Sequence, residues 1–420
     1  MIELDPSAPR LAGIVRDGDV VMWGQASAEA TPLTGALVAQ RAEIGTFTAY
    51  VGISWSDAVQ PAHADRVRFV SYCGAGRNRL LSRAGLLDVM PCHYADFARM
   101  VGSGEFAVDV LLLQVAPPDA QGRYSLSLAG DYLVPAIRRA RVVIAEVNAQ
   151  APATHGPHAL TAEDIHYVIH TDRPPLEAPA AKAHPAEAAV ARNVASLVED
   201  GATLQVGIGN LPEAILAQLG DRRDLGLHTG AMGDAAGELM RRGVITNARK
   251  SIDAGVSVAG VLMGTRTLNA FAHRNPAIEL RAADYTHAHA TLARIDQLVA
   301  INAAIEVDLT GNINSEVAGG VYVGAVGGAT DFLRGARASR GGLPIIALPS
   351  RTAGGTSTIV ARLNGPVSTS RSDTGLVVTE HGIADLRNLS LAQRVQRMIA
   401  IAHPDDRDRL AAEARQPGPV

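Results

Sequence analysis

The feature that most restricts the fold of this 420-residue chain is a series of aliphatic runs in which apolar and polar residues do not alternate. A strand with one face in water alternates such residues, whereas a strand covered on both faces stays apolar throughout. Longer segments with helical periodicity separate the runs, so the sequence predicts an α/β fold with open, largely parallel sheets. The runs lie at 67–76, 108–118, 140–148, 298–309, 343–350 and 374–382.

The length of the chain points to two domains rather than one. Residues 171–187 concentrate proline and alanine and interrupt the hydrophobic pattern, as a linker does. Similar phrases stand on either side of it, DGDVVMWG at 17–24 and DGATLQVGIG at 200–209, which indicates a weak internal repeat. We predict an N-terminal domain at 1–175, a linker at 176–190 and a C-terminal domain at 191–420.

Charge and composition exclude several classes of function. A formal net charge of −4 gives no field that would attract nucleic acid or an anionic membrane. No basic start followed by an apolar stretch is present, and no window of about 18 apolar residues occurs. Cys73 and Cys92 lack the spacing of metal ligands. We therefore expect a cytoplasmic protein with no metal, no nucleic-acid partner and no membrane association.

A glycine-rich phrase, VGIGNLPEAILAQLGD, joins an expected strand to an expected helix in the second half. Gly207 and Gly209 allow a ligand to approach the backbone, and Asn210 is expected to cap the helix. The start of a helix favours a phosphate or a developing oxyanion. A tight structural turn also explains such a phrase when it stands alone.

Two further phrases of this kind follow in the same half. In VYVGAVGGATDFLRGA, at 321–336, three glycines precede a helix expected to begin near Thr330. In PSRTAGGTSTIVARL, at 349–363, glycine and hydroxyl residues precede another expected helical run. Because ligands of open α/β sheets bind where strands end and helices begin, three such turns favour a nucleotide-like or thioester ligand.

The order of these phrases resembles that of the acetyl-CoA hydrolase/transferase family, which includes 4-hydroxybutyrate CoA-transferases. The resemblance covers nearly the whole chain and rests on MPCHYADF, VAPPDAQGRYSLSLAGDY, AEVNAQAPATHG, GIGNLP, GVITNARK, NAAIEVDLTGNINSE, GAVGGATDFLRGA, IIALPS and VVTEHGIADL. It implies two related α/β domains with the active site at their interface, and a homodimer or higher homo-oligomer. It also implies acyl-CoA and a small carboxylate as substrates, with coenzyme A as substrate or product and no permanently bound cofactor. The residues it implies for CoA and thioester binding are Gly207, Ile208, Gly209, Asn210, Leu211, Gly324, Gly327 and Gly328.

The chain departs from the family at one central residue. The family carries a nucleophilic glutamate in a phrase of the type His-Thr-Glu, and this glutamate holds CoA as a glutamyl thioester. Here Gly230 follows His228 and Thr229, while GVITN at 243–247 keeps its usual distance. Transfer of CoA between two carboxylates needs that covalent carrier. The sequence therefore predicts an enzyme that works without glutamyl-CoA, by thioester hydrolysis or direct acyl transfer.

Direct attack requires a base near the position of the missing carboxylate. His228 is the first candidate, because residues 228 and 230 point to the same side of an extended segment; the alternative is that it only packs. Two other functions remain open: CoA transfer through a substitute carboxylate, and a non-catalytic CoA-binding or assembly partner. Asp234 and Glu238 follow Gly230; Glu238 is considered as a displaced nucleophile, but a solvated helix face is favoured for both. Glu316 and Glu380 stand inside family phrases, where a place near the site and a structural hydrogen-bonding role are both open.

Overall fold

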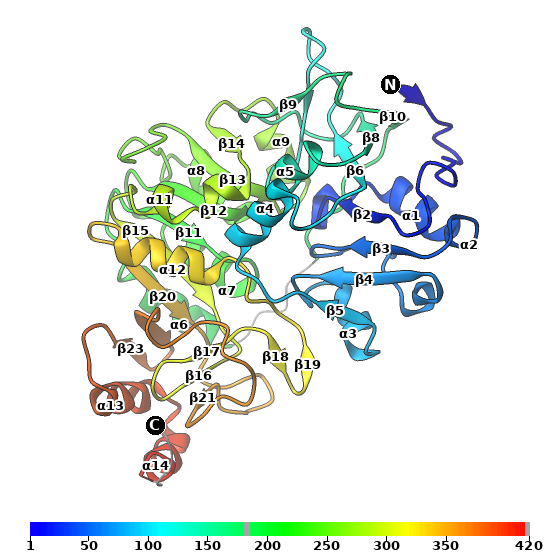
Figure 1. Ribbon diagram of the computed structural model, residues 1–420. Coiled ribbons are helices and arrows are strands. Elements are labelled where there is room, and N and C mark those ends of the chain that lie inside the picture. The colour runs from blue at the N-terminus through cyan, green and yellow to red at the C-terminus, as the bar shows by residue number, and fades with distance from the viewer. Residues whose placement is uncertain (180–184, 416–420) are drawn as a thin grey trace.

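The computed structural model describes residues 1–179 and 185–415, which form two eight-stranded sheets with helices packed on both faces (Figure 1). The first sheet is parallel throughout. In spatial order its strands are β1 (Ile2–Glu3), β10 (Tyr167–Thr171), β8 (Val142–Asn148), β6 (Val110–Val115), β2 (Val20–Trp23), β3 (Phe47–Tyr50), β4 (Val67–Ser71) and β5 (Leu87–Val89).

The second sheet is parallel except for its last strand, β23, which runs antiparallel to β22. In spatial order its strands are β14 (Ile278–Leu280), β13 (Ser257–Leu262), β12 (Gly226–Met232), β11 (Thr203–Val206), β15 (Leu298–Ala303), β20 (Leu343–Ala347), β22 (Leu376–Thr379) and β23 (Gly382–Asp385).

Seven strands of each sheet follow the same path, which explains the internal repeat in the sequence. The chain enters at a central strand, β2 or β11, and adds three strands outward on one side. It then returns to the other side of the central strand and adds three more. The two similar phrases, 17–24 and 200–209, contain or adjoin these central strands. The predicted fold class of two related open-sheet domains is confirmed.

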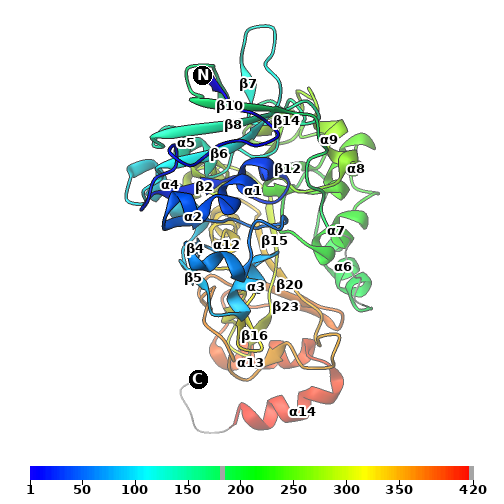
Figure 2. The same ribbon diagram turned by 90° about the vertical axis from the view of Figure 1, so that its right-hand side faces the viewer.

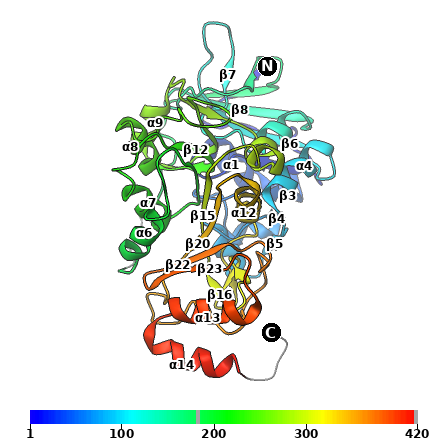
Figure 3. The same cartoon turned by 90° about the vertical axis from the view of Figure 1, so that its left-hand side faces the viewer.

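Helices cover both faces of each sheet. In the first half they are α1 (Thr31–Ala39), α2 (Arg41–Ile44), α3 (Asn78–Arg83), α4 (Tyr94–Ser103) and α5 (Leu133–Ile137). Figures 2 and 3 show α6 (Glu187–Ala195), α7 (Asn210–Ala217), α8 (Asp234–Arg241) and α9 (Arg266–Ala272) on one side of the second sheet and α12 (Ala329–Ala338) on the other. The remaining helices of the second half are α10 (Ala283–Thr286), α11 (His289–Leu292), α13 (Leu391–Ile401) and α14 (Pro404–Glu413).

Short strands form three small additional sheets. The three-stranded one lies near α13 at the lower end of the molecule in Figure 1. The strands are β16 (Glu306–Asp308), β17 (Ile313–Asn314) and β21 (Ile359–Val360), then β18 (Val317–Ala318) with β19 (Val321–Tyr322), and β7 (Tyr124–Ser125) with β9 (Ala159–Leu160).

The six aliphatic runs all form strands, and most of these strands are buried on both faces; β4, in which Arg68 is exposed, is an exception. Every residue of β6 and β8 is buried, for example, as expected for central strands of a covered sheet. One cluster of buried side chains continues from the first sheet into the second, including Leu113 of β6 and Val261 of β13. The two halves therefore share part of their core.

Two expectations from the sequence differ from the structure. The run at 298–309 divides into β15 and β16, which belong to different sheets. The helical run expected within 349–363 is wrong, since β21 forms there instead. Ile359 is fully buried and pairs with Val307 of β16, and a β-branched residue suits this pleated position.

The first sheet ends with β10, and α6 opens the second half. The predicted linker at 176–190 includes residues 180–184, which lie outside the described residues, and the domain boundaries stay a prediction. Within the described part of the chain, every helix is too short or too polar to span a bilayer.

Candidate functional site

The first glycine-rich turn follows β11, the strand at which the second sheet reverses its order. After β11 the chain forms β12 on one side of this strand and later β15 on the other side. Ligands of open α/β sheets bind next to the carboxyl ends of the strands at such a reversal point. The N–H of Gly207 donates to the carbonyl of Ile301 at 2.9 Å. Gly209 has φ +114°, which favours glycine, and Ile208 is 47% exposed. The turn therefore presents an accessible backbone at the ends of the strands where open α/β sheets commonly bind ligands.

The helix after this turn, α7, begins at Asn210, with Gly209 in the N-cap position. The expectation that Asn210 is the capping residue is therefore wrong by one position, because the open backbone of Gly209 makes the transition. The expected apolar face is confirmed, since its four residues are buried: Leu211, Ile215, Leu216 and Leu219.

The second glycine-rich turn connects the two halves of the molecule. The carbonyl of Gly324 accepts the N–H of Gly74 at 2.8 Å, and the carbonyl of Gly327 accepts the N–H of Tyr94 at 3.1 Å. Gly328 is the N-cap residue of α12, next to the predicted helix start. This turn lies where the first half meets the second, as expected for a site between domains.

Gly230 lies on β12, beside the first turn. The hydroxyl of Thr229 donates to the carbonyl of Val206 at 2.9 Å, which joins β12 to the end of β11. A Cβ atom at residue 230 would lie 2.9 Å from Nε2 and 3.0 Å from Cε1 of His287. The space beside Gly230 is therefore occupied by an imidazole ring.

His287 also touches the second turn. A Cβ atom on Gly328 would lie 2.6 Å from both Nε2 and Cδ2 of the same ring. Aromatic rings from both halves hold the imidazole, with centroid distances of 4.9 Å to Tyr94 and 4.5 Å to Phe332. Nδ1 lies 2.8 Å from the hydroxyl oxygen of Thr286. The ring is thus fixed between the two glycines that the family resemblance emphasises.

His287 is 4% exposed, and burial lowers its pKa to about 3. The imidazole is therefore neutral near pH 7. Sequence reasoning missed this residue, because it lies on a different segment 57 positions after Gly230. Only the packing of α10 against β12 and β13 brings the two together.

His228, the base predicted from the sequence, is fully buried. Its Nε2 lies 3.1 Å from the carbonyl oxygen of Thr286, and because a carbonyl only accepts, Nε2 carries the proton. Burial first, and then the charge of Lys250, lower the pKa of His228 to about 3. Its role as a base stays a prediction, and its lack of exposure disfavours it; the structure shows it supporting the backbone next to His287.

A buried polar network lies behind the His287 ring. The carboxylate of Asp131 accepts hydrogen bonds from Nε2 of Gln25 at 2.7 Å and from the hydroxyl of Tyr94 at 3.1 Å. Tyr72 donates to Gln25 at 2.8 Å. Burial raises the pKa of Asp131 to about 6. Tyr94 thus links the imidazole to a carboxyl group of the first half.

The four carboxylates considered from the sequence all have other partners in the structure. Asp234 accepts hydrogen bonds from the backbone N–H and the hydroxyl of Thr265, and Glu380 accepts the same pair of bonds from Ser350. Glu238 forms an ion pair with Arg241. Glu316 accepts hydrogen bonds from the hydroxyls of Tyr322 and Ser368.

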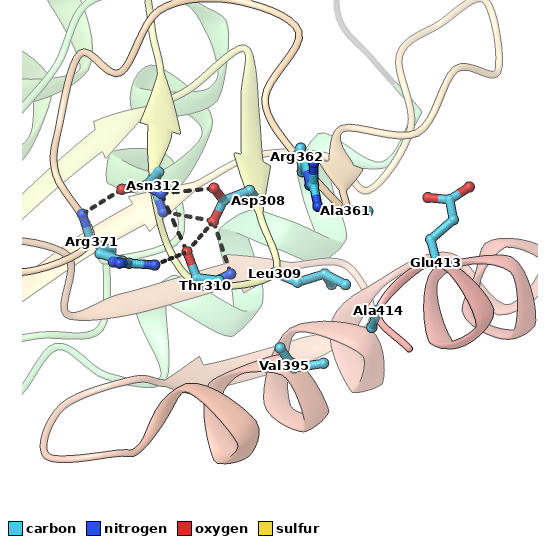
Figure 4. Close-up of a pocket in the computed structure, with 10 residues that line it drawn as sticks. All are labelled: Asp308, Leu309, Thr310, Asn312, Ala361, Arg362, Arg371, Val395, Glu413 and Ala414. Atoms are coloured by element: carbon cyan, nitrogen blue, oxygen red, sulfur yellow. Dashed lines mark hydrogen bonds between the residues drawn. The ribbon is translucent and has the colours of Figure 1, made fainter. Parts of the chain in front are cut away.

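A pocket of about 100 Å³ lies elsewhere, between the three-stranded sheet and the C-terminal helices (Figure 4). The Asp308 carboxylate in it accepts from Thr310 and Asn312. These polar groups satisfy one another, and neither Gly230 nor a residue of the two glycine-rich turns lines the pocket. Across the described residues, no group of three or more His, Cys, Asp or Glu side chains is placed to hold a metal ion.

Comparisons with known proteins agree with this architecture. Residues 6–177 match the acetyl-CoA hydrolase/transferase N-terminal domain, and residues 264–414 match the C-terminal domain of that name. The 4-hydroxybutyrate coenzyme A transferase of Clostridium kluyveri is 38% identical over 81% of this chain and 80% of its own length. The succinyl-CoA:cyclohexane-1-carboxylate CoA transferase of Geobacter metallireducens is 33% identical over 96% of this chain and 93% of its own.

Solved structures show the same likeness. RipA from Yersinia pestis superposes with a TM-score of 0.93 at 34% identity, covering 99% of this chain and 97% of RipA. A 4-hydroxybutyrate CoA-transferase from Porphyromonas gingivalis gives a TM-score of 0.81 at 31% identity, covering 96% and 94%. The fold is thus of the CoA-transferase type. The chain belongs to the acetyl-CoA hydrolase/transferase family, whose members act as acyl-CoA hydrolases and CoA-transferases.

Proposed function

We propose that this chain processes an acyl-CoA without a glutamyl-CoA intermediate, so that the acyl acceptor attacks the thioester directly. The observation that carries this proposal is the contact between Gly230 and His287. The family resemblance places the nucleophilic glutamate at residue 230, but glycine stands there and the imidazole fills the adjoining space. No carboxylate can extend from this backbone position.

The two glycine-rich turns support a CoA thioester as the substrate. Gly207 to Leu211 form the proposed CoA-binding turn, and Gly324, Gly327 and Gly328 contribute to the proposed thioester pocket. Backbone N–H groups at such turns stabilise the oxyanion that forms when a thioester carbonyl is attacked, and each well-placed donor contributes roughly 3–4 kcal/mol. These elements remain in this chain although the glutamate is absent.

Water is the simplest acceptor. Its oxygen bonds to the thioester carbon, the carbon–sulfur bond breaks, and the products are a free acid and CoA, with both protons supplied by the water. A bound alcohol in place of water would make the same site an acyltransferase. A bound small carboxylate would form a mixed anhydride, and attack of the CoA thiolate on the other carbonyl would then transfer CoA. We further propose that the enzyme works in the cytoplasm as a homodimer or higher homo-oligomer, and light scattering during gel filtration measures that assembly.

The test combines turnover with a search for a protein adduct. Release of free thiol is followed for a panel of acyl-CoAs, with and without small carboxylates. In parallel, the protein is trapped with hydroxylamine or borohydride and its intact mass is measured. The proposal expects thiol release by an unmodified protein. Binding of CoA esters without turnover across the panel would contradict catalysis and favour a non-catalytic CoA-binding partner.

A second function, CoA transfer through a substitute carboxylate, is favoured by one observation. Asp131 is a buried carboxyl group with a pKa raised to about 6, linked through Tyr94 to the ring beside Gly230. If it serves as the carrier, trapping modifies Asp131, and Asp131→Asn abolishes both the adduct and transfer between carboxylates. The direct-attack proposal expects no adduct on this residue.

A further inference from the structure

One nitrogen of the imidazole beside Gly230 is bound to Thr286, and the other lies against Gly328, a residue of the proposed thioester pocket. We propose that His287, as a neutral imidazole with its proton on Nε2, donates a hydrogen bond to the thioester carbonyl oxygen as it becomes an oxyanion. This inference rests on the proposed function, and it assigns the side chain that stabilises the oxyanion when the acceptor attacks the thioester directly.

The position of Nε2 supports this assignment. The atom lies 2.9 Å from the Cβ position of Gly230 and 2.6 Å from that of Gly328. It is therefore beside both the family's nucleophile position and the start of α12, where backbone N–H groups favour negative charge. Any side chain larger than hydrogen at either glycine would meet the ring.

The partners of the ring decide where its proton lies. Thr286 is fully buried, and Nδ1 of His287 is the one hydrogen-bond partner that its hydroxyl has among the described residues. If Nδ1 carried the proton, the buried hydroxyl hydrogen would have no acceptor, which is costly. If the hydroxyl donates to Nδ1, the proton lies on Nε2. No residue that the structure describes is bonded to Nε2, so this donor is free for substrate.

The surroundings hold the ring in one orientation. Tyr94 and Phe332 pack against it, and His228 donates to the carbonyl of Thr286, the residue before it. A donor fixed before the reaction costs no reorganisation when charge develops, which is the property that makes such groups effective.

The same surroundings favour a donor over a base. Burial first, and then the neighbouring His228, keep the imidazole neutral, with a pKa of about 3. A base with so low a pKa removes a proton from water poorly. A neutral imidazole is, however, a competent hydrogen-bond donor to a carbonyl oxygen.

In the proposed step His287 keeps its proton throughout. The acceptor oxygen bonds to the thioester carbon, and the carbonyl electron pair moves to oxygen, where Nε2–H and backbone N–H groups stabilise it. When the carbonyl re-forms, the carbon–sulfur bond breaks and CoA leaves as a thiolate. The departing thiolate takes up the proton that the attacking water loses, so the products are the acid and CoA as a thiol.

The test compares two substitutions. His287→Gln places an amide N–H near the position of Nε2, whereas His287→Leu removes the donor and keeps an apolar side chain. Removal of one such donor lowers kcat about 100- to 1,000-fold, and we expect this loss for His287→Leu with little change in KM. His287→Gln should stay within about tenfold of the parent, since it restores the hydrogen bond. His289→Gln, at an exposed position two residues later, serves as the control and should change nothing.

Thermal unfolding and calorimetric CoA binding show whether each variant folds. If His287→Leu does not fold, Thr286→Val tests the same inference, because it releases Nδ1 and should lower kcat while the ring remains. Full activity of His287→Leu, or equal inactivity of the Gln and Leu variants, would overturn the donor role. Absence of thiol release by the unaltered enzyme would instead overturn the proposed function, and this inference with it.

Discussion

Restoring a side chain at residue 230 should damage the protein unless His287 is removed as well. An added Cβ would lie 2.9 Å from Nε2, whereas ordinary contacts begin at 3.4 Å, so the overlap is 0.5 Å. The ring has little room to retreat, because Gly328 lies against it and Tyr94 and Phe332 pack beside it. Overpacking of this kind costs about 1–3 kcal/mol.

A double-mutant cycle measures this contact directly. We expect Gly230→Ala to lower the free energy of unfolding by about 1–3 kcal/mol, and we expect most of that loss to disappear in the His287→Ala background. Gly35→Ala in α1 is the control, since a Cβ there meets nothing within 4 Å. Denaturant unfolding gives the free energy of unfolding of the parent, the two single variants and the double variant. If Gly230→Ala is neutral, or if the two changes are additive, the proposed contact is refuted.

The same contact predicts the outcome of restoring the family's glutamate. Gly230→Glu alone should give no glutamyl-CoA on trapping, because the carboxylate and the imidazole compete for one space. The double variant Gly230→Glu with His287→Ala should yield a trapped adduct at residue 230. An adduct in the single variant would show that the His287 ring moves aside readily, contrary to the packing described above.

Three other predictions concern pH, the first turn and Asp131. The unfolded imidazole of residue 287 takes up a proton below about pH 6.5, but the folded one does not until about pH 3, so stability should fall as pH drops through this window. Between pH 4.5 and 6.5, the free energy of unfolding measured with denaturant should therefore depend less steeply on pH in His287→Gln than in the parent, by up to about 1.4 kcal/mol per pH unit. Equal slopes in the two proteins would contradict the lowered pKa. Gly209→Ala should weaken CoA binding measured by calorimetry, because a backbone φ of +114° is strained for any residue with a side chain. Gly122→Ala is the control: Gly122 has φ +72° in an open turn, so this change should lower the stability of the protein but leave its affinity for CoA unchanged. Asp131→Asn should leave thiol release largely intact if attack is direct, and complete loss of turnover in a folded variant would favour the carboxylate carrier.

Much of the fold could be predicted because local sequence and tertiary structure agree. The all-apolar runs become central strands, and the apolar face of α7 is buried as its helical spacing indicates. The segment at 349–363 could not be predicted from local propensity, because Ile359 forms a strand only through its pairing with β16. There a distant partner decides the structure.

Only part of the candidate site could be predicted from the sequence. Two glycine-rich turns and the change at Gly230 stand in recognisable phrases. In the structure the first turn follows β11, next to β12, and the second turn and Gly230 both lie against His287. His287 lies in no glycine-rich turn or expected catalytic phrase. Its relation to Gly230 arises when β13, β14 and α10 return the chain to β12, so only the three-dimensional structure reveals it.

The central claim is that the acceptor, and not a protein carboxylate, attacks the thioester. A single turnover in water enriched in oxygen-18, with enzyme in excess over the acyl-CoA that is cleaved fastest, tests it directly. Direct attack by water places the heavy isotope in the acid released in that first turnover and leaves the protein unlabelled. If a protein carboxylate carries CoA, the first acid released contains an oxygen from the protein, and the isotope enters the protein instead. A labelled acid with an unlabelled protein is the result we expect, and an unlabelled acid with a labelled carboxylate would contradict the account.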